Sequence, residues 1–193
     1  MTKKRRARSA QPTVIDACCL IDLLVSGQAE AILRATGNAW HLPSSVQAEV
    51  QYIRQYDPDK PGSHQNVPVD LTPFVTSGVL TLCQPDDAQE QAMYVQYAAL
   101  FRSDGEAMCL ALAECRGWTV ATDDPRAIQV AHKAGLSIVS CPEMVQAWAH
   151  RTGSDATCLI QVLTDIQALA QFRPNPSMPC YPWWVRQMAA ISP

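Results

Sequence analysis

Short apolar runs alternate with longer segments of helical spacing along most of the chain. The runs predict buried strands at residues 13–16, 40–43, 79–82, 118–122 and 136–139. Helices are predicted between them, at residues 17–33, 44–53, 86–101, 107–115 and 125–134. Such alternation is typical of a mainly parallel sheet with helices on both faces, so we predict an α/β protein with a three-layer α/β/α fold.

Three segments depart from this alternation. Residues 57–73 are rich in Pro, Gly, Asn and Asp, which predicts an irregular excursion. Further helices are predicted at residues 143–150 and 156–172, and the second has an apolar stripe suited to the core or to a dimer face. The remaining tail, residues 173–193, combines several prolines with Trp183 and Trp184, and we expect it to pack on the domain or on a partner.

Charge is distributed unevenly. The chain of 193 residues carries 15 Lys and Arg against 18 Asp and Glu, a net charge of −3. Five of these basic residues lie among the first eight positions, so residues 1–12 are predicted to form a basic, disordered arm with weak affinity for phosphate. The rest of the chain is acidic, and its hydrophobic content of 48% rules out disorder throughout.

Cysteine spacing and apolar run length indicate a reduced, cytoplasmic protein. The eight cysteines form no CxxC pair and the four histidines do not pair at ligand spacing, which favours small buried thiols over disulfides or zinc. No apolar run reaches the roughly 18 residues that suggest a membrane span. The charged start is not followed by a signal-like apolar stretch. Glycine-rich nucleotide loops and the Asp-x-Asp of aspartyl-phosphate phosphatases are also missing.

Acidic residues lie at the ends of several predicted elements. Asp16 closes the first strand, Asp123 and Asp124 follow the fourth, and Glu49 and Glu106 lie near the starts of helices. A parallel sheet would bring the first and fourth strand ends to one edge, where ligands bind in such folds. Each acid also has an ordinary interpretation, as a helix cap for Asp16 and Asp124, a backbone contact to Ser103 for Glu106, and a solvated helix residue for Glu49.

Carboxylates that converge repel one another, and each raises the pKa of its neighbours unless a cation compensates them. Oxygen ligands favour Mg²⁺ or Mn²⁺. Such an ion lowers the pKa of a bound water and neutralises charge on a scissile phosphate. The set of acids therefore predicts hydrolysis of a phosphodiester without a His or Cys nucleophile.

Four segments resemble the motifs of PIN-domain nucleases. Residues 14–21 (VIDACCLI) resemble the first motif, and residues 44–50 (SSVQAEV), which contain Glu49, resemble the second. Residues 104–113 (DGEAMCLALA) are similar to the third motif and residues 117–124 (GWTVATDD) to the fourth. The resemblance covers about residues 13–140, and the Gly-Glu-Ala form of the third motif is similar to predicted nucleic-acid-binding PIN proteins related to the toxins of VapBC-type systems.

The resemblance implies a PIN-like domain over residues 13–150 and a C-terminal helix and tail over residues 151–193. It implies an endoribonuclease that depends on Mg²⁺ or Mn²⁺ and leaves a 5′-phosphate and a 3′-hydroxyl. RNA is the implied substrate, an antitoxin protein a candidate partner, and a homodimer the expected assembly.

The site residues are also carried over from the resemblance. Asp16 and Glu106 would bind metal directly, and Glu49 would bind metal or hold its water. The fourth acid is Asp124 or Asp123: the family commonly has an acid two residues after the Thr, which favours Asp124, but Asp123 is also an option.

Two departures leave an alternative open. The family often has Thr, Ser or Asn directly after the first Asp, whereas this chain has Ala17 and Cys18. Basic residues near the motifs are few, namely Arg102, Arg116, Arg126 and Lys133. The alternative is a catalytically inert PIN-like module that binds RNA or a protein.

Overall fold

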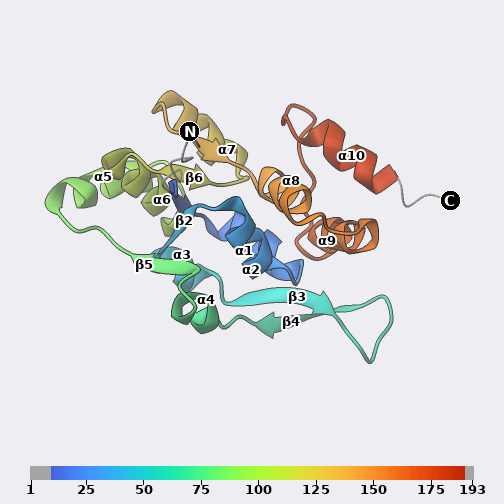
Figure 1. The fold of residues 1–193 in the computed structure, drawn as a ribbon. Coiled ribbons are helices and arrows are strands. Elements are labelled where there is room, and N and C mark those ends of the chain that lie inside the picture. The colour runs from blue at the N-terminus through green and yellow to red at the C-terminus, as the bar shows by residue number, and fades with distance from the viewer. Residues whose placement is uncertain (1–9, 190–193) are drawn as a thin grey trace, which may run out of the picture.

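A five-stranded sheet forms the centre of the structure, a computed structural model that describes residues 10–189 (Figure 1). Its strands are β1 (Pro12–Ile15), β2 (Ala39–Pro43), β5 (Leu80–Cys83), β6 (Thr119–Ala121) and β7 (Ile138–Val139). They lie in the order β5-β2-β1-β6-β7, and every neighbouring pair is parallel. β1 is the central strand, and its Val14 and Ile15 are fully buried, as expected for a parallel strand covered on both faces.

Helices cover both faces of the sheet and confirm the predicted three-layer α/β/α architecture. One group consists of α1 (Ala17–Val25), α2 (Ala29–Thr36) and α8 (Cys141–Thr152), which pack on one another. The other consists of α5 (Ala88–Ala98), α6 (Asp104–Arg116) and α7 (Pro125–Lys133), in which α6 contacts β1, β2 and β6. Within residues 10–189, no helix has the length and apolar character needed to cross a bilayer.

The segment after β2 differs from the prediction. The helix expected over residues 44–53 ends early, as α3 (Ser44–Glu49), and Ile53 lies in strand β3 (Tyr52–Tyr56). Residues 57–73, predicted to be irregular, contain β4 (His64–Pro68) and the start of α4 (Thr72–Thr76). Residues Tyr52–Tyr56 form a strand because β4 pairs with them. This pairing overrides the helical spacing that predicted a longer helix.

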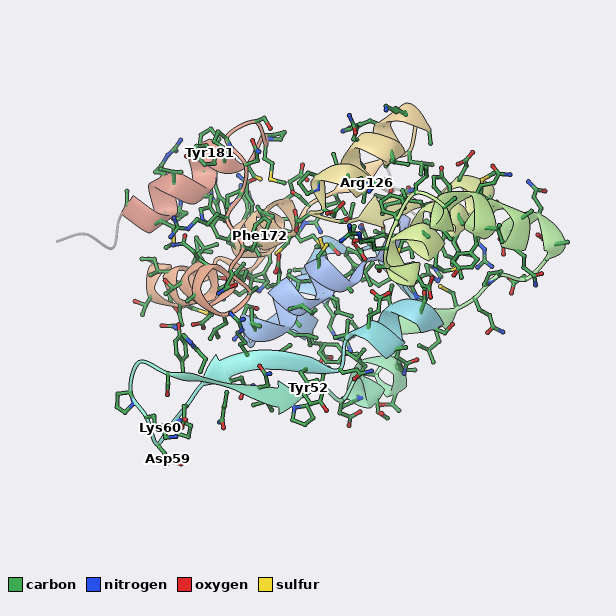
Figure 2. All side chains as sticks on the ribbon, turned by 180° about the vertical axis from the view of Figure 1, so that it is seen from behind. Tyr52, Asp59, Lys60, Arg126, Phe172 and Tyr181 are labelled. Carbon is green, nitrogen blue, oxygen red and sulfur yellow. The ribbon has the colours of Figure 1, made fainter. Side chains whose placement is uncertain are left out.

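The β3–β4 hairpin runs beneath α1 and extends away from the main sheet (Figure 1). Tyr52 and Tyr56 are 57% and 45% exposed on it. Asp59 and Lys60 lie at its tip (Figure 2). The strands pair only with each other, so the hairpin is a separate two-stranded sheet.

The C-terminal segment ends in a helix that packs on the domain. α9 (Ala156–Leu169) is followed by an irregular Pro-rich stretch and by α10 (Tyr181–Ala189), which contacts α9. Trp184 is 2% exposed, and its ring meets Phe172 edge-on with centroids 6.1 Å apart. Its burial attaches α10 to the domain. The predicted basic arm, by contrast, lies almost wholly outside the described residues.

Truncation of Trp184 tests this attachment. We expect Trp184→Ala to lower the free energy of unfolding by about 3 kcal/mol, the low end for a large core aromatic. The neighbouring Trp183 is only half-buried, so Trp183→Ala should cost clearly less. Urea unfolding of both variants makes the comparison, and equal losses would show that α10 is not held by Trp184.

Candidate functional site

The ends of β1 and β6 lie level with each other and carry three of the acids. Asp16 follows β1 directly, and its backbone N–H donates to the Ala121 carbonyl at 2.9 Å. Asp123 and Asp124 follow β6 after Thr122. The parallel pairing of β1 with β6 therefore brings together residues that are far apart in the sequence.

Asp16 is held by several donors at this position. One carboxylate oxygen, Oδ1, accepts from the Ala17 N–H at 2.7 Å. The other, Oδ2, accepts from Thr122 Oγ1 at 2.9 Å and from Cys18 Sγ at 3.1 Å. Burial raises the pKa of Asp16, and these three hydrogen bonds oppose the rise. Asp16 is also the N-cap of α1, so its ordinary interpretation holds as well.

Glu49 reaches from the end of α3 to the start of α6. Its Oε1 accepts from Ser103 Oγ at 2.9 Å and from the Gly105 N–H at 2.8 Å. A Cβ at position 105 would lie 2.6 Å from Glu49 Oε2, so a side chain there would displace the carboxylate. Gly105 thus makes room for Glu49 on the positive end of the α6 dipole.

The negative charges of the neighbouring acids affect the pKa of Glu106. Burial raises its pKa to about 7, and the negative charges of Asp16, Asp124 and Glu49 add to the rise. We call Asp16, Glu49, Glu106 and Asp124 the four-acid site. A divalent cation near these carboxylates would relieve such repulsion.

The two neighbouring acids after β6 face different surroundings. Asp124 caps α7 by accepting from the Ala127 N–H at 2.7 Å, and its charge acts on Glu106. Asp123 is 7% exposed, and its Oδ2 accepts from the Cys141 N–H and from Cys19 Sγ, both at 3.0 Å. The charge of Asp124 thus acts on Glu106, whereas Asp123 is held by buried donors, although the charge of Asp16 also contributes to the raised pKa of Asp123.

A second group of potential metal ligands includes Asp123. Asp22, Asp123 and Cys141, which we call the buried triad, each offer one ligand atom, and these atoms lie within 4.8 Å of one another. This group can hold a metal ion. Burial raises the pKa of Asp22 to about 8 and that of Asp123 to about 6, since charge is costly there.

The sequence analysis missed Asp22 and Cys141 as candidates. Asp22 is an acid within an apolar helical run, three residues after the buried Cys19, so it lies on the stripe that faces the core. An acid on the core-facing side of a helix could have identified Asp22 as a candidate site residue. Cys141 had no equivalent signal, because its partners come from distant parts of the chain. All eight cysteines are free, and four of them are buried.

The basic residues near the motifs have different surroundings. Arg116 donates to Glu90 at 2.6 Å and to Asp86 at 2.8 Å, and its guanidinium lies 4.8 Å from the Trp118 ring centroid. It is therefore engaged in an ion-pair network. Arg126, two residues after Asp124, is exposed and lies 5.6 Å from the centroid of the Phe101 ring. Figure 2 shows Arg126 at the start of α7.

Comparison with known proteins adds nothing further: no protein-family model matches the chain, and no curated protein matches it.

The close approach of Gly105 to Glu49 leads to a prediction. We expect Gly105→Ala to weaken Mn²⁺ binding by about tenfold or more, as expected for disturbing a ligand's support. Stability should change by only about 1 kcal/mol, since the helix propensity of Ala offsets part of the lost hydrogen bonding. Calorimetric titration and urea unfolding give the two quantities. In the Glu49→Gln background the same change should have little further effect on affinity, and full additivity would contradict the contact.

The raised pKa of Glu106 gives a pH dependence of definite sign. In the folded protein Glu106 keeps its proton up to about pH 7, whereas the ordinary value is 4.5. The folded state therefore binds more protons in this window, and the free energy of unfolding falls as the pH rises through it. Without divalent cations, Glu106→Gln should fall less steeply than the wild type, while Asp104→Asn, an exposed neighbour, should not differ. Urea unfolding at several pH values measures this, and parallel curves for Glu106→Gln and the wild type would contradict it.

Proposed function

We propose that the protein is an endoribonuclease that depends on Mg²⁺ or Mn²⁺ and has a PIN-like fold. The observation that carries the proposal is the placement of Asp16, Glu49, Glu106 and Asp124 where β1, α3 and β6 end and α6 begins, and the raised pKa of Glu106 supports it. Such a shift is expected where carboxylates are arranged for a cation or for proton transfer. The resemblance of four sequence motifs to PIN nucleases supports the same conclusion.

The residues present fit a divalent cation. Asp16, Glu106 and Asp124 would hold it, and Glu49 would hold it or a water bound to it. A bound Mg²⁺ or Mn²⁺ supplies Lewis-acid chemistry, which activates a water and neutralises charge on a phosphodiester. The space that Gly105 leaves for Glu49 is part of this fit, because any larger residue would move a ligand.

The protein groups have separate roles in this mechanism. Thr122 and the Ala17 N–H fix the orientation of Asp16 through hydrogen bonds to its two oxygens. Ser103 and the Gly105 N–H fix Glu49 in the same way. Glu106, whose pKa is raised by burial and by the neighbouring acids, would lose its proton when the cation binds and would then serve as a ligand to it. In-line attack on the phosphodiester would leave a 5′-phosphate and a 3′-hydroxyl.

Substrate contacts are proposed at the rim of the site. Arg102 and Arg126 are exposed there, and cationic side chains of this kind hold a nucleic-acid backbone without reading its sequence. Specificity for RNA would then depend on shape and loops. An antitoxin protein as inhibitor, and a homodimer as the working assembly, belong to the same proposal.

One observation favours the inert alternative, a PIN-like module that binds RNA or protein. Ala17 and Cys18 stand where the family often has Thr, Ser or Asn directly after the first Asp, and the Cys18 thiol donates to the same Asp16 oxygen as Thr122. That oxygen then has two partners and is less available to a cation. Replacement of Cys18 by Ala removes this second donor and separates the two ideas, because an impaired enzyme should gain activity and an inert module should not.

Cleavage of structured RNA by the purified protein is the direct test. With Mn²⁺ present we expect cleavage that Asp16→Asn and Glu106→Gln each reduce about a hundredfold or more, since even a partner of a metal ligand is worth 10–100-fold. Asp104→Asn is the matched control. Asp104 is also an acid in the first turn of α6, but its Oδ1 accepts from the Tyr94 hydroxyl at 2.8 Å, on the α5 side.

Two results would contradict the proposal. Equal cleavage by the wild type and Asp16→Asn would point to a contaminating nuclease. Absence of saturable Mn²⁺ binding, together with absence of cleavage, would favour the inert module. Mapping the termini of the products separates hydrolysis to a 5′-phosphate from metal-independent cleavage that leaves a cyclic phosphate.

A further inference from the structure

We propose that the buried triad, Asp22, Asp123 and Cys141, is a second metal site, which binds Zn²⁺ and is distinct from the four-acid site. Its ligands come from the middle of α1, the end of β6 and the first residue of α8. The proposal does not depend on RNA cleavage, because it concerns different side chains and a different ion.

Unpaired carboxylate oxygens are the first argument. Asp22 is 5% exposed and Asp123 is 7% exposed. Within residues 10–189, Asp22 Oδ2 and Asp123 Oδ1 are buried side-chain atoms that have no hydrogen-bond partner. A buried polar atom without a partner costs free energy, and a buried charge costs more. A cation between these oxygens would satisfy both.

The surroundings of Asp123 leave one oxygen free for an ion. Its Oδ2 is already used, because the Cys141 N–H and Cys19 Sγ both donate to it at 3.0 Å. These bonds fix the orientation of the carboxylate, as outer partners of metal ligands commonly do. Oδ1 then remains available on the same rigid group. Asp123 is thus positioned by two donors and still lacks a partner on its other oxygen.

The donor set selects the ion. Two carboxylates and a thiol combine hard and soft ligands, which suits Zn²⁺ or Co²⁺ and disfavours Mg²⁺. Tetrahedral zinc with bonds of about 2.0–2.3 Å places its ligand atoms within about 4 Å of one another. The triad atoms lie within 4.8 Å, so a shift of about 1 Å would close the site. On binding, Cys141 coordinates as the thiolate and releases its proton to solvent.

A cavity lies next to one member of the triad. Asp123 lines a cavity of about 600 Å³ that is also bounded by Ser140, Glu143 and the Pro-rich stretch from Phe172 to Pro179. Ser140 directly precedes Cys141, so the cavity reaches the edge of the triad. This cavity is therefore the side from which an ion would approach Asp123.

Cobalt spectroscopy tests the proposal. Metal-free protein, reduced with a phosphine and kept in excess Mg²⁺ to fill the four-acid site, is titrated with Co²⁺. We expect one equivalent to bind, with a near-ultraviolet band for charge transfer from thiolate to cobalt and visible bands of tetrahedral cobalt. Added Zn²⁺ should remove these bands. Absence of the bands in the wild type would overturn the proposal and leave a shared proton between Asp22 and Asp123 as the explanation of the pair.

Variants assign the ligands. Cys141→Ser should lose the charge-transfer band, whereas Cys158→Ser, a half-buried thiol on α9, should keep it. Cys18→Ser should also keep it, and loss there but not in Cys141→Ser would place the thiolate beside Asp16 and overturn the proposal. Asp22→Asn keeps the shape of the side chain, so it guards against misfolding of the Cys141 variant. It should weaken Co²⁺ binding by at least about tenfold and abolish the rise in melting temperature that Zn²⁺ gives the wild type.

Discussion

The four-acid site depends on one constraint. Carboxylates that lie close together and are partly buried cost free energy, because their charges repel and lose contact with water. Asp16, Glu49, Glu106 and Asp124 act on one another there, and the fold compensates with donors rather than with basic side chains. Backbone N–H groups at the starts of α1, α6 and α7 supply several of these donors, so the same helix ends that complete the fold also hold the acids. The compensation is incomplete, since the pKa of Glu106 stays near 7. On the function proposed above, a cation would remove that residual cost.

The two neighbouring acids after β6 belong to different groups: Asp124 to the four-acid site and Asp123 to the buried triad. The charge of Asp124 acts on Glu106. The preceding Asp123 is buried and accepts hydrogen bonds from Cys19 on α1 and Cys141 on α8. Adjacent residues of an extended segment point to opposite sides, so a pair of neighbouring acids serves two places at once. If both places bind metal as proposed, the outer one, with oxygen ligands alone, would suit hard ions, and the interior one, with its thiol, would suit softer ions. The two residues that follow Thr122 therefore place one acid in the buried triad and the next in the four-acid site.

The sheet was predictable from sequence because it rests on local signals, and the positions of the acids at the ends of its elements follow from the same signals. Strands such as Thr13–Asp16 are short apolar runs, and an acid that follows such a strand must lie at the sheet edge where ligands collect. The sequence favoured Asp124 over Asp123 only through the family resemblance, since the different donors around each carboxylate come from distant parts of the chain. The β3–β4 hairpin was missed because its strands are stabilised by pairing with each other. The buried triad was missed because Cys141 joins Asp22 only through the tertiary fold, and spacing rules for zinc ligands detect only ligands that are close in sequence.

The lengths of the outer strands have a consequence for assembly. The sheet ends on one side in β5, with four residues, and on the other in β7, with two. Open edges are templates for adding a strand from another molecule, and short edges limit that hazard. A second chain could extend this sheet by only a few hydrogen bonds, so edge-to-edge growth into fibres is disfavoured by the architecture itself.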